Sequence, residues 1–136
     1  MSQFQLSQRS LARLIGVHPD LVEIVKLAIR RTTVDFIVVE GVRTLAQQRE
    51  YVTKGASQTM NSLHLKQPDG YGHAVDLAPL VGGAIPWDRW EEFRRLADVV
   101  KACAAELGAP VEWGGDWKSF KDGPHFQISR DWRGLQ

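Results

Sequence analysis

The sequence predicts an α+β domain, with helices packed on a small, mostly antiparallel sheet. Its 136 residues are close to the common size for a single hydrophobic core, and 43% of them are hydrophobic. Four segments have helical patterns and four short segments have strand patterns, with no repeat or long linker between them. We therefore expect one domain over residues 1–136.

Two helices are predicted near the N-terminus. The segment 7–17, "SQRSLARLIGV", can form a short first helix. His18 and Pro19 follow, and Pro19 favours the start of a second helix because its ring fixes a helical φ. The second helix would bury a broad apolar stripe, formed by Leu21, Val22, Ile24, Val25, Ala28 and Ile29.

Two further helices have recognisable ends. Thr44 and Gln47 have the spacing of a capping box, which opens a helix that continues to about Thr53. The longest helical pattern is "DRWEEFRRLADVVKACAAELG". We expect Asp88 to be its N-cap and Gly108 to end it.

Four strands complete the prediction. The segment 36–41, "FIVVEG", is apolar and β-branched, which is typical of a buried strand. The segment 72–79, "GHAVDLAP", has a second strand pattern. Residues 110–113 and 125–128 are predicted as two short strands around the loop 114–124.

Composition excludes several classes of function. The net charge of +1 provides no basic field for nucleic acid or an anionic membrane. The single cysteine, Cys103, cannot form an internal disulfide or a cysteine-based zinc site. No segment approaches the ~18 consecutive apolar residues of a membrane span. Residues 1–20 lack the apolar core of a secretory signal, so a target outside the cytoplasm would require separate delivery.

The stretch 62–79, "SLHLKQPDGYGHAVDLAP", holds two histidines and two aspartates. Successive side chains of a strand point to opposite faces, so His73 and Asp76, three residues apart, should not ligate one metal together. Asp76 shares its face with Ala74 and Ala78, which are small enough to leave room for an ion.

His64 is free of this constraint. The loop that follows it, "KQPDGYG", can turn the chain back toward Asp76. Only His18 and His125 remain as histidines for a third ligand. We expect His18 to cap a helix or lie on the surface, whereas His125 opens a strand three residues after Asp122.

A set of His64, Asp76 and His125 suits a catalytic zinc with an open fourth position for water. Asp122 could then take the proton from that water. The spacing alone leaves another interpretation open, in which both histidines are surface residues and Asp76 caps a turn.

At these residues the sequence resembles a known family of zinc peptidases. The family includes D-Ala-D-Ala carboxypeptidases and the L-alanyl-D-glutamate peptidases used as bacteriophage endolysins. Its first signature, S-x-H followed by G-x-A-x-D, matches Ser62, His64, Gly72, Ala74 and Asp76. In this pattern residue 73 occupies a variable position, so the resemblance also excludes it as a ligand.

The second signature and an upstream segment extend the resemblance over about residues 36–128. An acidic residue followed three positions later by histidine matches Asp122 and His125. The segment "EGVRTLAQQ" is similar to the one that supplies an active-site arginine, here Arg43. The run "EWGGDWKSFKDGPHFQ" is most similar to the endolysin branch.

The resemblance implies a fold of the D-Ala-D-Ala carboxypeptidase, or Hedgehog/DD-peptidase, type. It implies hydrolysis of the L-alanyl-D-glutamate bond in peptidoglycan stem peptides, with Zn²⁺ held by His64, Asp76 and His125. Asp122 would act as the base and later protonate the leaving amine. Arg43 would neutralise an oxyanion or bind a substrate carboxylate.

Other residues have two interpretations each. Ser62 either hydrogen-bonds substrate or fixes the turn before His64. Trp113 and Trp117 either line the cleft and bind substrate or pack elsewhere. The gap after His64 is longer than is usual in the family, and we expect the insertion Lys66–Gly70 to form a loop at the rim of the site.

The same residues are compatible with two alternative functions. These are a D-alanyl-D-alanine carboxypeptidase and a non-catalytic, zinc-stabilised wall-binding module. A serine hydrolase is disfavoured because no G-x-S-x-G elbow is present. For an endolysin we expect a monomer without a stable membrane association or a separate wall-binding domain. It would stay in the host cytoplasm until a holin-type membrane protein gives it access to the wall, where it causes host lysis.

Overall fold

The computed structural model describes residues 4–57 and 59–134 and confirms the predicted α+β class. Its helices are α1 (Gln8–Arg13), α2 (Pro19–Arg31), α3 (Leu45–Thr53) and α4 (Trp90–Leu107). Its strands are β1 (Phe36–Glu40), β2 (Ala74–Pro79), β3 (Val111–Trp113) and β4 (His125–Ile128). A 3-10 helix, η1 (Gly114–Asp116), begins the loop between β3 and β4.

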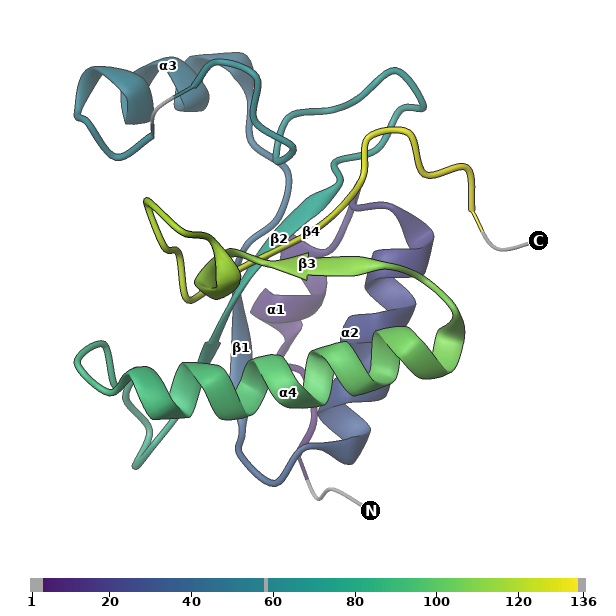
Figure 1. Ribbon diagram of the computed structural model, residues 1–136, viewed down its shortest axis with the longest axis vertical. Coiled ribbons are helices and arrows are strands. Elements are labelled where there is room, and N and C mark those ends of the chain that lie inside the picture. Colours follow the sequence, from purple (N-terminus) through teal and green to yellow (C-terminus); the bar gives the residue numbers. More distant parts are fainter. Residues whose placement is uncertain (1–3, 58, 135–136) are drawn as a thin grey trace.

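The four strands form one antiparallel sheet in the order β1-β2-β4-β3. Helix α2 packs against α4, and Figure 1 shows α3 set apart from the other helices. The core contains Leu21, Ile24 and Val25 of α2, Leu96 and Val100 of α4, and Val75, Leu77, Phe126 and Ile128 of the sheet. Apolar faces of two helices and the sheet therefore enclose one core, as the sequence pattern predicts.

The helix ends follow the predicted chemistry with one exception. The side chain of His18 caps α2, and Thr44 and Gln47 make the predicted capping box. Gly108 ends α4 in the left-handed conformation with φ 75°. The prediction of Asp88 as N-cap was wrong, because Arg89 occupies the N-cap position. Asp88 lies inside a turn that is closed by a hydrogen bond of 2.9 Å from the Arg89 amide to the Pro86 carbonyl.

No helix among the described residues is both long enough and apolar enough to span a membrane.

Candidate metal centre and active site

Two histidine side chains from separate segments meet on the carboxylate of Asp76. The pairing of β2 with β4 sets Asp76 opposite His125, and the loop before β2 brings His64 to the same place. Oδ1 of Asp76 lies 3.2 Å from Nε2 of His64 and 3.4 Å from Nδ1 of His125. We call these three residues the metal centre, because together they are one of the groups of metal-ligating side chains in the described structure.

The geometry of the metal centre fits a tetrahedral zinc ion. Zinc ligands at about 2.0–2.1 Å lie about 3.3–3.4 Å from one another in a tetrahedron, close to both separations from Asp76. The second nitrogen of each ring already has a partner. Nδ1 of His64 lies 2.8 Å from the carbonyl oxygen of Gly41, and Nε2 of His125 lies 2.7 Å from Oε1 of Gln127. Both rings can donate to these oxygens and leave a lone pair for a metal.

Burial strengthens the electrostatic interactions among the three residues of the metal centre. His64 and His125 are buried, with exposed fractions of 1% and 7%. Burial by itself would raise the pKa of the Asp76 carboxyl, but hydrogen bonds and charge from His125 and His64 hold this pKa far below its usual range. A carboxylate with a lowered pKa between two imidazoles is a suitable ligand set for a divalent cation.

As the pH falls, zinc binding at the metal centre should begin to weaken at a higher pH than it would with an ordinary histidine ligand. Burial acts to lower the pKa of His125, but Asp76 and Gln127 outweigh it and raise this pKa above its ordinary value. A ligand imidazole must lose its proton, so below the raised pKa the affinity for zinc should fall about tenfold per pH unit. Titration of the metal-free protein with zinc at several pH values measures this slope. An affinity that is flat down to the ordinary range of a free imidazole would contradict the prediction.

Asp122 lies beside the metal centre on the turn that leads into β4. Its carbonyl accepts from the His125 amide at 3.2 Å, and its own amide donates to the Gly114 carbonyl at 3.1 Å. Burial and the charge of Asp76 raise the pKa of the Asp122 carboxyl, and the charges of His125, His64 and Arg43 oppose them. A carboxylate with a raised pKa next to a metal centre is suited to proton transfer.

Gly114 sets the position of Asp122 and His125 by its lack of a side chain. A Cβ at this position would lie 2.5 Å from the Asp122 carbonyl oxygen and 3.1 Å from the His125 Cβ. We predict that Gly114→Ala lowers cleavage on the order of 10²-fold, because it displaces both groups. Gly82→Ala is the control, since a Cβ at Gly82 (φ 60°) meets nothing within 4 Å and adds only backbone strain. Unchanged cleavage by Gly114→Ala would refute this role.

Arg43 reaches the metal centre from the segment after β1. Its Nη2 lies 3.6 Å from Oδ2 of Asp76, and its Nη1 donates to Oε1 of Gln48 at 3.0 Å. Its Nε pairs with Glu40, whose other carboxylate oxygen accepts from Tyr51 at 3.0 Å. The guanidinium is thus held rigidly beside the metal centre, with N–H groups left for a further anion.

A pocket of about 730 Å³ opens over the metal centre. Its lining includes the predicted site residues Arg43, Ser62, His64, Asp122 and His125. Ser62 also accepts a hydrogen bond from the His64 amide at 3.1 Å. This contact agrees with the interpretation in which Ser62 fixes the turn before His64.

The prediction of Trp113 as a substrate-binding residue was wrong. Its side chain is only 4% exposed, its indole N–H donates to the Gly123 carbonyl at 2.7 Å, and it is not part of the pocket lining. Trp117 does line the pocket, with its ring 5.1 Å from that of His125. The 3-10 helix η1 lies between the two tryptophans in the chain.

The other two histidines lie outside the metal centre. His73 contacts Asp69 and the Ser129 carbonyl, and His18 lies next to them. Sequence reasoning missed several partners of the metal centre, namely the Gly41 carbonyl, Gln127, Glu40 and Gly114. The first of these is a backbone group, which no side-chain motif can reveal. Gln127 alone had a signal, because it shares a strand face with His125.

Comparisons with known proteins give a consistent result. A family model described as phage L-alanyl-D-glutamate peptidase matches residues 1–131. The L-alanyl-D-glutamate peptidase of Escherichia phage T5 is 30% identical over 131 residues, which cover 93% of this chain and 90% of that protein. The enzyme of the same name from Listeria phage A118 is 38% identical over 96 residues, 71% of this chain and 31% of that protein. The crystal structure of the Serratia marcescens L-Ala D-Glu endopeptidase ChiX is 44% identical, with a TM-score of 0.82 over 93% of this chain and 92% of that one.

Proposed function

The chain belongs to the phage L-alanyl-D-glutamate peptidase family, and from this premise we propose that it is an endolysin that hydrolyses the L-alanyl-D-glutamate bond of peptidoglycan stem peptides with the help of zinc. The observation that carries the proposal is the metal centre of His64, Asp76 and His125 under an open pocket. Asp122 and Arg43 beside it supply groups that a purely structural zinc site does not need. They favour an enzyme over a wall-binding module.

In the proposed mechanism, His64, Asp76 and His125 hold the metal ion. When bound, zinc supplies a Lewis acid that polarises the scissile carbonyl and acidifies the attacking water. Gly41 and Gln127 fix the tautomers of the two imidazoles, so that both rings present a lone pair to the ion.

Asp122 transfers the proton. It accepts a proton from the water whose oxygen bonds to the carbonyl carbon of L-alanine, and it returns that proton to the nitrogen of D-glutamate as the carbon–nitrogen bond breaks. The raised pKa of its carboxyl brings it closer to neutral pH, where it can both accept and donate. Arg43 holds Asp76 and offers its remaining N–H groups to the oxyanion or to a substrate carboxylate.

Cationic side chains support an anionic stem peptide as the substrate. Lys121 and Arg130 line the pocket together with Arg43. Arg130 is oriented by Oδ1 of Asn61 at 2.8 Å, and Lys121 by the Gly115 carbonyl at 3.3 Å. On the leaving side of the cleavage site, D-glutamate carries one free carboxylate, because its other carboxyl forms the amide bond to the next residue, and this charge complements the cationic side chains.

Digestion of purified peptidoglycan tests the proposed function. The expected products have D-glutamate as a new N-terminus, whereas a D-alanyl-D-alanine carboxypeptidase would release free D-alanine. Labelling of new amino termini, followed by mass spectrometry, separates the two. Release of D-alanine alone would replace the endolysin proposal with the carboxypeptidase, and binding without any cleavage would support the wall-binding module.

The similarity to two phage enzymes supports a role in host lysis. We propose that the protein acts from the host cytoplasm, with a holin-type membrane protein opening the path to the wall. Bacteria that express it alone should lyse little, and they should lyse promptly once the inner membrane is permeabilised. The turbidity of the culture measures both conditions, and an Asp122→Asn protein is the inactive control. Prompt lysis of cells with an intact inner membrane would contradict the dependence on a holin.

A further inference from the structure

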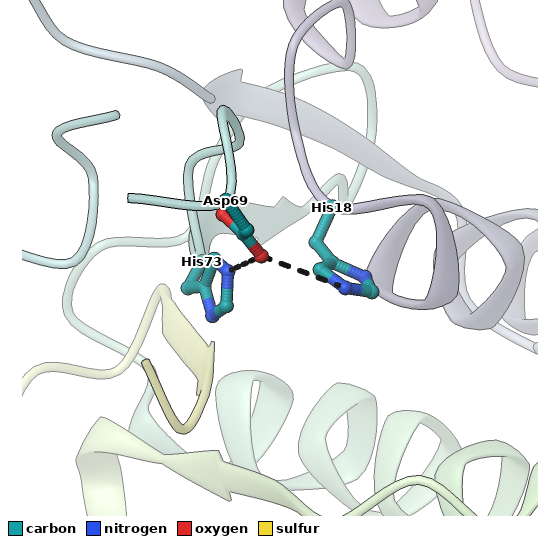
Figure 2. A group of neighbouring side chains, drawn as sticks. All are labelled: His18, Asp69 and His73. Carbon is teal, nitrogen blue, oxygen red and sulfur yellow. Dashed lines mark hydrogen bonds and ion pairs between the residues drawn. The ribbon is translucent and has the colours of Figure 1, made fainter. Parts of the chain in front are cut away.

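A second cluster of metal-ligating side chains consists of His18, Asp69 and His73, which we call the loop cluster. Figure 2 shows the Asp69 carboxylate between the two rings. Its Oδ2 lies 2.7 Å from Nε2 of His73 and 3.9 Å from Nε2 of His18, and the ring centroids are 5.1 Å apart. The loop cluster shares no residue with the metal centre, and the proposed mechanism does not use it.

The three residues come from different parts of the chain. His18 precedes α2, Asp69 belongs to the insertion between His64 and β2, and His73 comes directly before β2. His73 is fully buried, at 0% exposure, and His18 is 7% exposed. The Asp69 side chain is 28% exposed, so this side of the cluster remains open to solvent.

Hydrogen bonds fix the arrangement of the loop cluster. Nδ1 of His73 lies 2.8 Å from the Ser129 carbonyl oxygen, and its Nε2 faces the Asp69 carboxylate. Both nitrogens of this ring therefore face oxygen atoms, a backbone carbonyl at Nδ1 and a carboxylate at Nε2. Burial acts to raise the pKa of Asp69, but the hydrogen bonds from His73 and the Tyr71 amide bring it below its usual value.

We propose that the loop cluster is a second site for a divalent transition metal of the zinc class, weaker than the metal centre. Two imidazoles and one carboxylate are ligands that such ions prefer. The ring of His73 is oriented as His64 is in the metal centre, with Nδ1 held at 2.8 Å by a backbone carbonyl in both cases. A divalent ion would replace the hydrogen between Nε2 of His73 and the Asp69 carboxylate.

Ligation requires a small movement of Asp69. About 3.3 Å is the separation expected between ligands of a tetrahedral zinc ion, between the present 2.7 Å and 3.9 Å. A shift of the carboxylate from His73 toward His18 would bring both separations close to this value. Asp69 can move because it lies in a partly exposed loop, between Pro68 and Gly70.

Binding also rearranges protons. For ligation, Nε2 of His73 must be free of hydrogen. The hydrogen on Nε2 of His18 must move to Nδ1, and this breaks the hydrogen bond that Nδ1 accepts from the Asp20 amide at 3.1 Å. The Asp20 carboxylate, 3.9 Å from this Nδ1 and anchored by the Trp132 indole at 2.8 Å, becomes the new acceptor. The loss of the helix cap explains why this site is the weaker one.

A metal in the loop cluster would fasten three segments together. The chain before α2 already binds the segment before β2, through the His18 amide and the Gly72 carbonyl at 2.9 Å. The ion would add the inserted loop and, through His73, the chain after β4. The loop cluster lies on the segment that joins His64 to Asp76, so the ion would stabilise the fold without taking part in catalysis.

Zinc stoichiometry tests this proposal without relying on peptidase activity. Tag-free protein is stripped with a chelator, dialysed against increasing zinc and analysed for metal by mass spectrometry. We expect two ions per chain for the wild type at saturation and one for Asp69→Asn, which keeps the shape of the side chain and should keep its cleavage activity. Asp88→Asn is the matched control, because Asp88 is exposed and lies outside both clusters.

Further variants identify which ion is lost. Asp76→Asn should keep the weaker ion and lose the tighter one, the reverse of Asp69→Asn. If Asp69→Asn does not fold, His18→Asn replaces it, because asparagine still caps a helix but is a poor zinc ligand. A wild type that saturates at one ion, or a folded Asp69→Asn that still binds two, would overturn the proposal and leave the loop cluster as an ion pair.

Discussion

Asp122→Asn should reduce the rate of stem-peptide cleavage by about 10²- to 10⁴-fold while zinc remains bound. Asparagine keeps the shape of the side chain and cannot accept the proton of the attacking water. The turn from Asp122 to His125 depends on backbone hydrogen bonds, which the substitution leaves in place. The metal centre should therefore stay intact while catalysis fails.

The control is Asp116→Asn, in the same loop. The Asp116 carboxylate binds Lys101 at 2.6 Å and its side chain is 54% exposed, so we expect nearly wild-type cleavage. Cleavage of labelled peptidoglycan and zinc content are measured for both variants. If Asp122→Asn retained its zinc and cleaved nearly as well as the wild type, Asp122 would not be the base.

His64→Ala should lose both the tightly bound zinc and the cleavage activity. A catalytic zinc needs three protein ligands, and the substitution leaves only Asp76 and His125. Zinc content is measured with free zinc buffered so low that only the tighter site fills. Chelation of the wild type should have the same effect on activity, and added zinc should reverse it.

His18→Asn serves as the matched control for the loss of an imidazole. It removes a buried histidine outside the metal centre and keeps a residue that caps α2. We expect it to retain the tight zinc ion and its activity. Loss of this ion from His18→Asn but not from His64→Ala would reverse the assignment of the ligands.

Local sequence rules predicted much of this arrangement. Strand alternation separated His73 from Asp76, and the structure indeed turns these side chains to different clusters. The capping box at Thr44 and the end of α4 at Gly108 follow from backbone chemistry that a few neighbouring residues determine. Such features depend on short segments, so a single sequence contains them.

Features that depend on distant contacts were not predictable from the sequence. Alternation assigned His73 to a face but could not show that Asp69 and His18 lie on the same side. Trp113 was misassigned because its burial depends on the Gly123 carbonyl and on Trp90 of α4, with ring centroids 5.5 Å apart. The Gly41 carbonyl that orients His64 is a backbone group and leaves no trace in the side-chain pattern.

The most direct test of the zinc assignment is anomalous diffraction at the zinc edge, on crystals of the protein loaded with one equivalent of zinc. We predict one strong peak about 2.0–2.2 Å from Nε2 of His64, a carboxylate oxygen of Asp76 and Nδ1 of His125. Asp122 should lie beside this peak without ligating it. A principal peak elsewhere, or one at this place that lacks any of the three ligands, would contradict the assignment.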